Sequence, residues 1–329
     1  MVDLSVLISA YRDRGYLTRA VASALDQTLP REHYEVIVDM GYSDPKAEQW
    51  LSDNDVSVSH HDYASCGRTH RELVNASRGR ILCILDDDDM FTRTKLEVVY
   101  KAFQEDRSLA FLHNNFVIMD EKDRVRQNHP MRRKSRRARV IVGEVLLGGV
   151  HPLSPLMSLP YLAPNFNNSC VSVSREVASK QFHRLDRIAH SLDTFYFFAS
   201  LISRGNVRII PSELTLYRVH SLNLQHNPDV DHSFLDSYTE ILNMVRGAHD
   251  VRIEEAAVAT LEGFRLYSLL RNEGASRASI LAAYRAFKPH IDLFRKVVVD
   301  NHSKTSIQVS VYLFLISPSV SRRLMHYLG

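Results

Sequence analysis

Along the first 120 residues, short apolar runs alternate with segments whose apolar residues recur every three or four positions. The first pattern predicts buried strands and the second predicts helices with one apolar face. The predicted strands are residues 4–10, 34–39, 56–60, 80–86 and 108–120. The predicted helices are residues 15–28, 43–53, 68–79 and 94–106. Repeated strand–helix units predict the α/β class, with a mostly parallel sheet covered by helices.

The rest of the chain is less regular. Residues 121–164 are rich in proline and indicate a long connection. The predicted elements after it are a strand at 167–175, an apolar helix at 191–205, and two short strands at 207–211 and 213–220. From about residue 230 the pattern is helical to the end of the sequence.

This change of pattern predicts two parts, an α/β domain over residues 1–222 and a C-terminal helical region over residues 223–329. Residues with preferred places at helix ends refine the boundaries. Ser43 or Asp44 is expected to cap the helix that begins at the following proline. Gly79 and Gly205 are expected to close the helices before them.

Composition changes this picture little, with 45% apolar and 24% charged residues. The three cysteines form no CxxC pair, so neither a disulfide framework nor a thiolate zinc site is expected. The N-terminal residues lack the pattern of a signal peptide, and no apolar stretch reaches the roughly 20 residues of a membrane-spanning helix. We therefore expect a cytoplasmic protein, with the inner face of the membrane as a possible location.

The net charge of +3 hides a local excess of positive charge. Residues 132–139, RRKSRRAR, hold six basic residues and no acid. This basic run is either an ordinary surface loop or a contact for an anionic acceptor or anionic lipid. It lacks interleaved aromatic residues, so nucleic acid is not an expected partner. The apolar part of residues 306–329 either lies at a membrane interface or packs as the last helix.

Acidic residues follow two of the predicted strands. Asp39 ends the second strand, and four consecutive aspartates, Asp86 to Asp89, follow the apolar strand RILCIL. In α/β sheets, ligands bind beyond the carboxyl ends of the strands. The aspartate run is therefore either a solvated acidic turn or a site that faces a cation, since hard carboxylate oxygens suit Mg²⁺ and Mn²⁺.

Five segments, in order over roughly residues 3–222, resemble the family 2 glycosyltransferases, inverting enzymes of the GT-A fold. They are LSVLISAYRDRGYLTRAVASALDQT, YEVIVDMGYSD, GRTHRELVNASRGRILCILDDDDMF, LDTFYFFASLISRG and LTLYRVH. The chain departs from the family's pattern at Met40 and Leu192, where acids are common, and near Arg71 at His70 and Glu72.

The resemblance implies a GT-A fold and transfer from a nucleotide-diphosphate sugar, with a UDP-sugar favoured. The acceptor would be a glycan or a lipid-linked molecule, as in polysaccharide or glycolipid biosynthesis. Mn²⁺ or Mg²⁺ would neutralise the diphosphate, and peripheral membrane contact is a further possibility.

The resemblance also implies roles for single residues. The implied nucleotide-sugar-binding residues are Ala10, Tyr11, Asp39, Arg71, Asp86 and Asp87. Asp88 and His220 would be metal ligands, and Asp193 would be the general base that takes the proton of the acceptor hydroxyl.

Each of these roles has a structural alternative. Asp39 suits an Asx-type turn, and Asp193 suits a helix cap. Tyr11 could simply pack, Arg71 could pair with an acid on its own helix, and His220 could be structural. One of the aspartates after Asp86 could cap the next helix or face solvent.

Two other functions fit parts of the sequence. A metal-dependent nucleotidyltransferase also places aspartates on an α/β sheet, but the loop SAYRDRGY is not the phosphate loop such enzymes usually carry. A non-catalytic nucleotide-sugar-binding protein would explain the apolar residues Met40 and Leu192.

Overall fold

A computed structural model of the protein describes residues 2–61, 65–126, 145–147, 166–221, 230–272, 274–293 and 311. The basic run 132–139 lies outside the described residues, as does the segment 306–329 apart from residue 311. The roles suggested for both segments therefore stay predictions. Within the described part of the chain, no helix combines the length and the apolar character that a membrane crossing requires.

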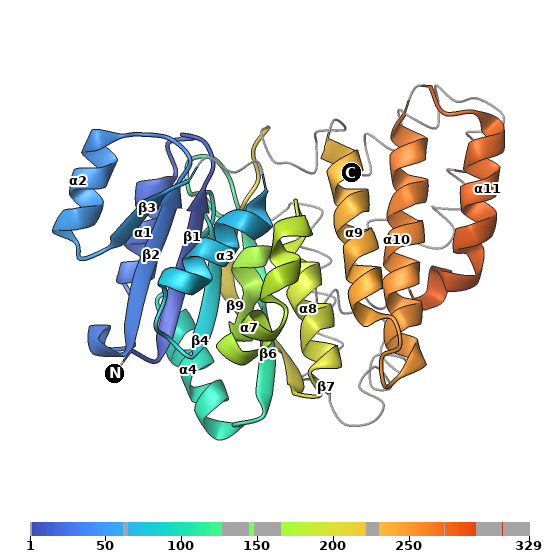
Figure 1. The fold of residues 1–329 in the computed structure, drawn as a ribbon. Coiled ribbons are helices and arrows are strands. Elements are labelled where there is room, and N and C mark those ends of the chain that lie inside the picture. Colours follow the sequence, from blue (N-terminus) through green and yellow to red (C-terminus); the bar gives the residue numbers. More distant parts are fainter. Residues whose placement is uncertain are drawn as a thin grey trace.

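Within the described residues, a nine-stranded sheet forms the centre of the fold (Figure 1). Its strands are β1 (Leu4–Ala10), β2 (Tyr34–Met40), β3 (Ser57–His60), β4 (Ile81–Asp86), β5 (Met90–Phe91), β6 (Leu109–Met119), β7 (Val145–Leu147), β8 (Val171–Ser174) and β9 (Asn206–Arg218). The order is β3-β2-β1-β4-β8-β6-β9-β5, and β7 pairs with β9. The first four of these strands are parallel, β6 is parallel to β9, and the remaining pairs are antiparallel. The expected α/β class is confirmed.

The helices predicted over the first 120 residues are all present. The helices of this part and of the central part are α1 (Leu17–Leu25), α2 (Pro45–Asp53), α3 (Cys66–Ala76), α4 (Lys95–Glu105), α7 (Arg175–Lys180) and α8 (Leu192–Ile202). Of the two candidate caps for α2, the structure uses Asp44, whose carboxylate accepts from the backbone N–H groups of Lys46 and Ala47. This local signal was sufficient because the cap and the helix start are adjacent in sequence.

Two predicted helix ends are wrong. Helices α3 and α8 both stop before Gly79 and Gly205. A Cβ atom on Gly79 would lie 2.4 Å from the carbonyl carbon of Leu4, and one on Gly205 would lie 2.5 Å from the Cβ of Ala110. Both glycines therefore allow close packing against a strand rather than a turn at the end of a helix.

The two short strands predicted at 207–211 and 213–220 form one strand, β9. In its pairing with β6, Asn114 is opposite Ile210 and Asn115 is opposite Glu213. The register thus skips Pro211 and Ser212. At such an irregularity, the N–H donor that proline lacks is not needed. The proline interrupts the ladder without ending the strand.

The two faces of the sheet bury separate hydrophobic clusters. On β1, Leu7 belongs to the cluster under α3, α7 and α8, whereas Val6 and Ile8 belong to the cluster under α1, α2 and α4. This division follows the alternation of side chains along a strand. Because both faces are covered, the open edge at the strand ends is the place left for a ligand.

The C-terminal helices are α9 (Asp231–Val245), α10 (Val251–Arg271) and α11 (Arg277–Phe287), which lie side by side beyond α8 (Figure 1). Ile241 of α9 and Ile253 of α10 belong to the cluster around α8, whereas Ile280 and Phe287 of α11 belong to a smaller cluster that they share with the last turns of α10. The described α9 and α10 thus share a core with the sheet. The predicted boundary after residue 222 stays a prediction.

Candidate active site

Asp39 and Asp86 lie on one edge of the sheet, on either side of β1. Ser9 of β1 is in register with Asp39 of β2 and with Asp86 of β4. Neighbouring strands are about 4.8 Å apart, so the Cα atoms of these two aspartates lie about 10 Å apart along the edge. The edge therefore offers two carboxylate sites to a single elongated ligand.

Asp39 is 1% exposed, and its two oxygen atoms differ. Oδ2 accepts from Ser59 Oγ at 2.6 Å and lies 2.5 Å from His61 Nδ1. Oδ1 is buried and has no hydrogen-bond partner among the described residues. A buried acceptor without a partner is costly, so Oδ1 is suited to accept from an N–H group of a ligand.

The residues beside Asp39 complete this end of the edge. Ala10 is buried, and its carbonyl oxygen accepts from the N–H of Gly41 at 2.9 Å. Tyr11 is 44% exposed, with the guanidinium group of Arg12 5.1 Å from its ring centroid. Met40 is buried in the hydrophobic cluster under α1, α2 and α4. The residue that replaces the family's acid at this position therefore packs in the hydrophobic core.

The four consecutive aspartates end β4 with Asp86 and continue into a turn, and together they are here called the aspartate turn (Asp86–Asp89). Asp87, Asp88 and Asp89 are all buried, so the alternative of a solvated acidic turn is wrong. Oδ2 of Asp88 lies 2.5 Å from Arg14 Nη1 and 2.9 Å from His220 Nε2. The sequence placed Asp88 and His220 together through the family's pattern, and the structure brings them into contact.

Asp89 has a different role from its neighbours. It is 1% exposed, and its carboxylate accepts from Asn167 Nδ2 at 3.0 Å and from the backbone N–H of Arg218 at 2.8 Å. Both oxygen atoms are thus engaged inside the protein. Asp89 fixes the turn to the end of β9.

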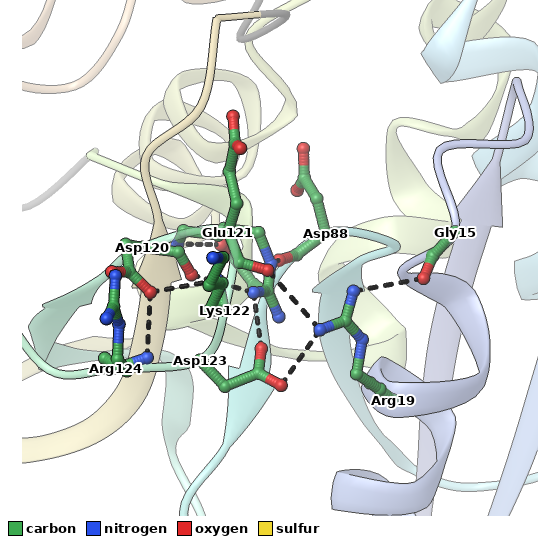
Figure 2. Close-up of polar contacts among 10 residues, drawn as sticks. Gly15, Arg19, Asp88, Asp120, Glu121, Lys122, Asp123 and Arg124 are labelled. Carbon is green, nitrogen blue, oxygen red and sulfur yellow. Dashed lines mark hydrogen bonds and ion pairs between the residues drawn. The ribbon is translucent and has the colours of Figure 1, made fainter.

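Arg218, the arginine of the YRVH segment, supports the turn from behind. Its side chain is fully buried; Nε donates to the backbone oxygen of Asp88 at 2.6 Å, and Nη1 pairs with Asp123. Figure 2 shows Arg19 reaching the same Asp123, while the carboxylate of Asp88 points away from this network. The network holds the backbone of the turn and leaves the Asp88 carboxylate facing the site.

Burial, together with the charges of Asp88 and Asp193, raises the pKa of Asp86 to about 7, against the hydrogen bond from Asn168. Burial and the charge of Asp88 also raise the pKa of Asp87 and of Asp89 well above the usual range. The carboxylates therefore destabilise one another in their charged forms. A bound cation would relieve that repulsion.

The donor set fits a hard divalent cation. Asp86, Asp88 and Asp89 each offer an oxygen atom, and these atoms lie within 4.8 Å of one another. Carboxylate oxygens are the ligands that Mg²⁺ and Mn²⁺ prefer. Since Asp89 is held by Asn167 and Arg218, Asp86 and Asp88 are the carboxylates best placed for a metal, with His220 next to Asp88.

A short segment before β8 joins the two halves of the site, and the sequence analysis missed it. Asn168 donates from Nδ2 to Asp86 Oδ1 at 3.1 Å and accepts through Oδ1 from the backbone N–H of Asp193 at 3.0 Å. Ser169 Oγ accepts from the backbone N–H of Asp86 at 3.0 Å. The signal in the sequence was the polar run NNS at the start of a predicted strand. In the structure, residues Asn168–Cys170 form a 3-10 turn there.

Lys95 supports this segment from inside the protein. It is fully buried, and its Nζ donates to the backbone oxygen of Ser169 at 2.5 Å, to Asn114 Oδ1 at 2.7 Å and to Thr215 Oγ1 at 3.2 Å. Burial lowers the pKa of Lys95 to about 8. The amine thus ties α4, β6 and β9 to the turn that carries Asn168.

Asp193 lies in the first turn of α8, and its Oδ1 accepts from the backbone N–H of Thr194 at 2.7 Å. The cap position belongs to Ser191, whose side chain makes no capping bond. Burial raises the pKa of Asp193 to about 6, against the hydrogen bonds from Thr194. Leu192, which stands where the family often has an acid, is buried in the core. Of these two neighbouring positions, Asp193 is therefore the one that offers a carboxylate.

Arg71 of α3 pairs with two acids. Its Nη1 lies 2.5 Å from Asp186, and Nη2 lies 2.9 Å from Glu72. These contacts match the alternative in which Arg71 pairs with an acid of its own helix. A contact with a nucleotide stays a prediction. His70 is buried, with Nδ1 3.1 Å from the hydroxyl of Tyr196.

Residues 5–158 match the family model described as glycosyl transferase family 2. A protein of Rickettsia bellii (strain RML369-C) named as an uncharacterized glycosyltransferase is 27% identical over 123 residues, which is 36% of this chain and 17% of that protein. The chain thus matches less than a fifth of the length of this relative.

Solved structures with a similar fold include S. aureus TarS 1-349, with 10% identity, a TM-score of 0.61 and coverage of 98% of this chain and 90% of that one. Its complex with UDP-GlcNAc gives 11% identity and a TM-score of 0.63, with coverage of 98% and 90%. A complex with UDP matches with a TM-score of 0.59 and 12% identity, over 99% of this chain and 87% of that one. This likeness establishes the fold and confirms the expected GT-A architecture.

Proposed function

We propose that the chain, whose residues 5–158 match the glycosyl transferase family 2 model, transfers a sugar from a nucleotide-diphosphate sugar to an acceptor hydroxyl, with inversion at the anomeric carbon. The observation that carries the proposal is the bridge made by Asn168. Its amide contacts the Asp86 carboxylate on one side and the backbone of Asp193 on the other. A donor-binding carboxylate and a candidate base are thereby held at fixed positions in one site.

The carboxylate of Asp39 would recognise the base of the donor. Its Oδ1 needs a hydrogen-bond donor, which uracil and guanine supply at a ring nitrogen and cytosine does not. Ala10 and Tyr11 border the same end of the edge. The UDP and UDP-GlcNAc complexes of TarS support a UDP-sugar as the donor.

Asp86 and Asp88, with His220, would hold Mn²⁺ or Mg²⁺ beside the diphosphate, and Asp87 lies next to them. The cation would neutralise the charge that the leaving nucleotide diphosphate carries away. Asn168 and Ser169 orient Asp86, and Arg218 fixes the backbone of Asp88.

Asp193 would act as the general base. An inverting transfer needs one carboxylate to take the proton of the acceptor hydroxyl while that oxygen attacks the anomeric carbon. With a pKa of about 6, Asp193 is charged at neutral pH and still basic enough to accept a proton. A glycan or lipid-linked acceptor, and contact with a membrane through residues 132–139, remain parts of this proposal.

The direct test changes Asp193 to Asn, which keeps the size of the side chain. Loss of a general base lowers rates by roughly 10²–10⁴-fold, so we expect transfer at saturating donor to fall by about that factor. Affinity for UDP with Mn²⁺ should not change, because the base contacts the acceptor. Asp26→Asn, the same change at an exposed aspartate that pairs with Arg93, is the matched control.

Until an acceptor is found, release of nucleotide from a panel of nucleotide sugars in the presence of Mn²⁺ gives the assay. Free nucleoside diphosphate supports the transferase. Formation of a nucleoside triphosphate and a sugar 1-phosphate when pyrophosphate is added would indicate a nucleotidyltransferase, and binding without turnover would indicate a non-catalytic protein. A transfer rate of Asp193→Asn within about threefold of the parent, far short of a general-base effect, would place the base elsewhere.

A further inference from the structure

Arg14 places its guanidinium group on the aspartate turn. Nη1 lies 2.5 Å from Oδ2 of Asp88 and 3.6 Å from Oδ1 of Asp87, and the side chain of Arg14 is 16% exposed. Burial opposes the charge of Arg14, but Asp87, Asp88 and Asp86 outweigh it and raise the pKa of the guanidinium group. Arg14 therefore supplies positive charge to the turn.

The oxygen atom that Arg14 contacts is also the one that contacts His220, the other proposed metal ligand. Oδ2 of Asp88 lies between Arg14 Nη1 and His220 Nε2. Two cations that share one carboxylate oxygen repel each other strongly in a buried site. Binding of a divalent cation by Asp88 and His220 therefore requires the guanidinium group to leave.

The position of Arg14 in the chain allows it to leave. It lies in the loop between β1 and α1, next to Gly15, which has a φ of +71° and no atom within 4 Å of a Cβ built on it. Arg12 and Asp13 of the same loop are exposed. Arg14 can thus change its contact without repacking either hydrophobic cluster.

The same loop begins at Tyr11, which follows β1 at the edge where the donor would bind. A guanidinium group presents paired N–H donors that match the oxygen atoms of a phosphate group. A diphosphate beside the aspartate turn is therefore a suitable second partner for Arg14.

We propose that Arg14 binds the diphosphate of the donor. Before the donor and the metal bind together, Arg14 pairs with Asp88 instead. This inference rests on the proposed donor and metal site. Arg14 exchanges its hydrogen bond to Asp88 for hydrogen bonds to the diphosphate oxygens. When the nucleoside diphosphate leaves, Arg14 returns to Asp88 and competes with the metal there.

The exchange predicts opposite effects on two equilibria for Arg14→Met. Mn²⁺ alone should bind more tightly, because no cation then occupies Asp88. UDP should bind more weakly at saturating Mn²⁺, because the diphosphate loses its arginine. Each affinity should change by about tenfold, the lower end of the range for a charge-assisted hydrogen bond. Electron paramagnetic resonance of free Mn²⁺ and titration calorimetry with UDP measure the two affinities without an acceptor.

Two further variants separate the exchange from a general effect of charge. Arg93→Met removes an arginine that pairs with Asp26 at an exposed position, and should leave both affinities unchanged. Arg14→Lys keeps the charge without the paired donors. It should bind Mn²⁺ as the parent does and bind UDP more weakly than the parent.

The outcomes distinguish this inference from the function on which it rests. If Mn²⁺ binds to the parent through Asp88 and Arg14→Met leaves its affinity unchanged, the inference is wrong and the proposed function stands. A parallel loss of both affinities in Arg14→Met would also overturn it, since damage to the turn would explain the result. If UDP binding to the parent is independent of Mn²⁺, the proposed metal dependence fails and the exchange fails with it.

Discussion

The carboxyl ends of β2 and β4 lie on the same edge of the sheet, yet the protein satisfies their carboxylates to different extents. At the end of β2, Oδ1 of Asp39 is buried without a partner among the described residues. At the end of β4, Asn168 contacts Asp86, and both Arg14 and His220 contact Asp88. Among the described residues, the carboxylate at the end of β2 thus lacks a partner for one oxygen atom, whereas the carboxylates at the end of β4 already have partners inside the protein.

This difference indicates how each end would bind a ligand. A buried acceptor without a partner gains a hydrogen bond as soon as an N–H group arrives, so the β2 end needs no rearrangement. At the β4 end a ligand gains only by exchanging existing contacts, and a cation is the natural substitute for Arg14. A nucleoside should therefore bind at the β2 end without metal, whereas a diphosphate at the β4 end should require it.

The largest effect is expected from Asp88→Ala, which removes the carboxylate that Arg14 and His220 contact at the β4 end. Truncating one partner of a buried charged contact costs about 2–5 kcal/mol, so the Mn²⁺-dependent part of UDP affinity should fall by about a hundredfold or more. UMP, which has no diphosphate, should bind as before. Calorimetry with both nucleotides, with and without Mn²⁺, measures this difference. An unchanged Mn²⁺-dependent affinity for UDP would remove Asp88 from the site.

A smaller effect, at the other end, is expected from Asp39→Asn. The amide cannot offer acceptors to both a base N–H and the donors Ser59 and His61, and an unpaired buried group costs about 1–3 kcal/mol. UMP and UDP should both bind about tenfold to a hundredfold more weakly. Pyrophosphate with Mn²⁺ has no base and serves as the control. If its affinity falls as much as that of UMP, the two ends are not independent.

The smallest effect concerns Asp193, which Asn168 joins to the β4 end. Because burial raises its pKa to about 6, Asp193 becomes protonated as the pH falls through 6 and then cannot accept a proton. At saturating donor and metal, the transfer rate should fall about fivefold between pH 6 and pH 5. Binding of UMP at the β2 end should not follow this decline. A rate that stays constant down to pH 4 would contradict the role of Asp193 as the base.

The sequence predicted which carboxylates share one edge of the sheet, because these signals are local. Asp39 and Asp86 each end an apolar strand, and successive parallel strands bring such ends to one edge. The helix cap at Asp44 was found for the same reason. His220 and Asp193 are far from these strands in sequence, and only the order of the family's segments connected them to the site.

The residues that the sequence analysis missed act through distant partners. Lys95 opens a helix and has the pattern of a surface residue, yet its three hydrogen-bond partners lie 19 to 120 positions away and bury it. Arg14 reaches Asp88 across 74 positions. No local period distinguishes a buried cation from an exposed one. The breaks expected at Gly79, Gly205 and Pro211 were wrong for a similar reason, because packing between strands and helices decides what these residues do.

The amide of Asn168 also limits how this sequence can evolve. Its amino end faces Asp86 and its carbonyl end faces the N–H of Asp193, so its two ends have opposite hydrogen-bonding character. Aspartate would place another negative charge against Asp86, and leucine would leave both partners without a hydrogen bond. A single substitution at position 168 therefore has few neutral outcomes. In an alignment of relatives, a change here should coincide with changes at the residues that face it, and such pairs would mark lineages in which the two halves of the site meet differently.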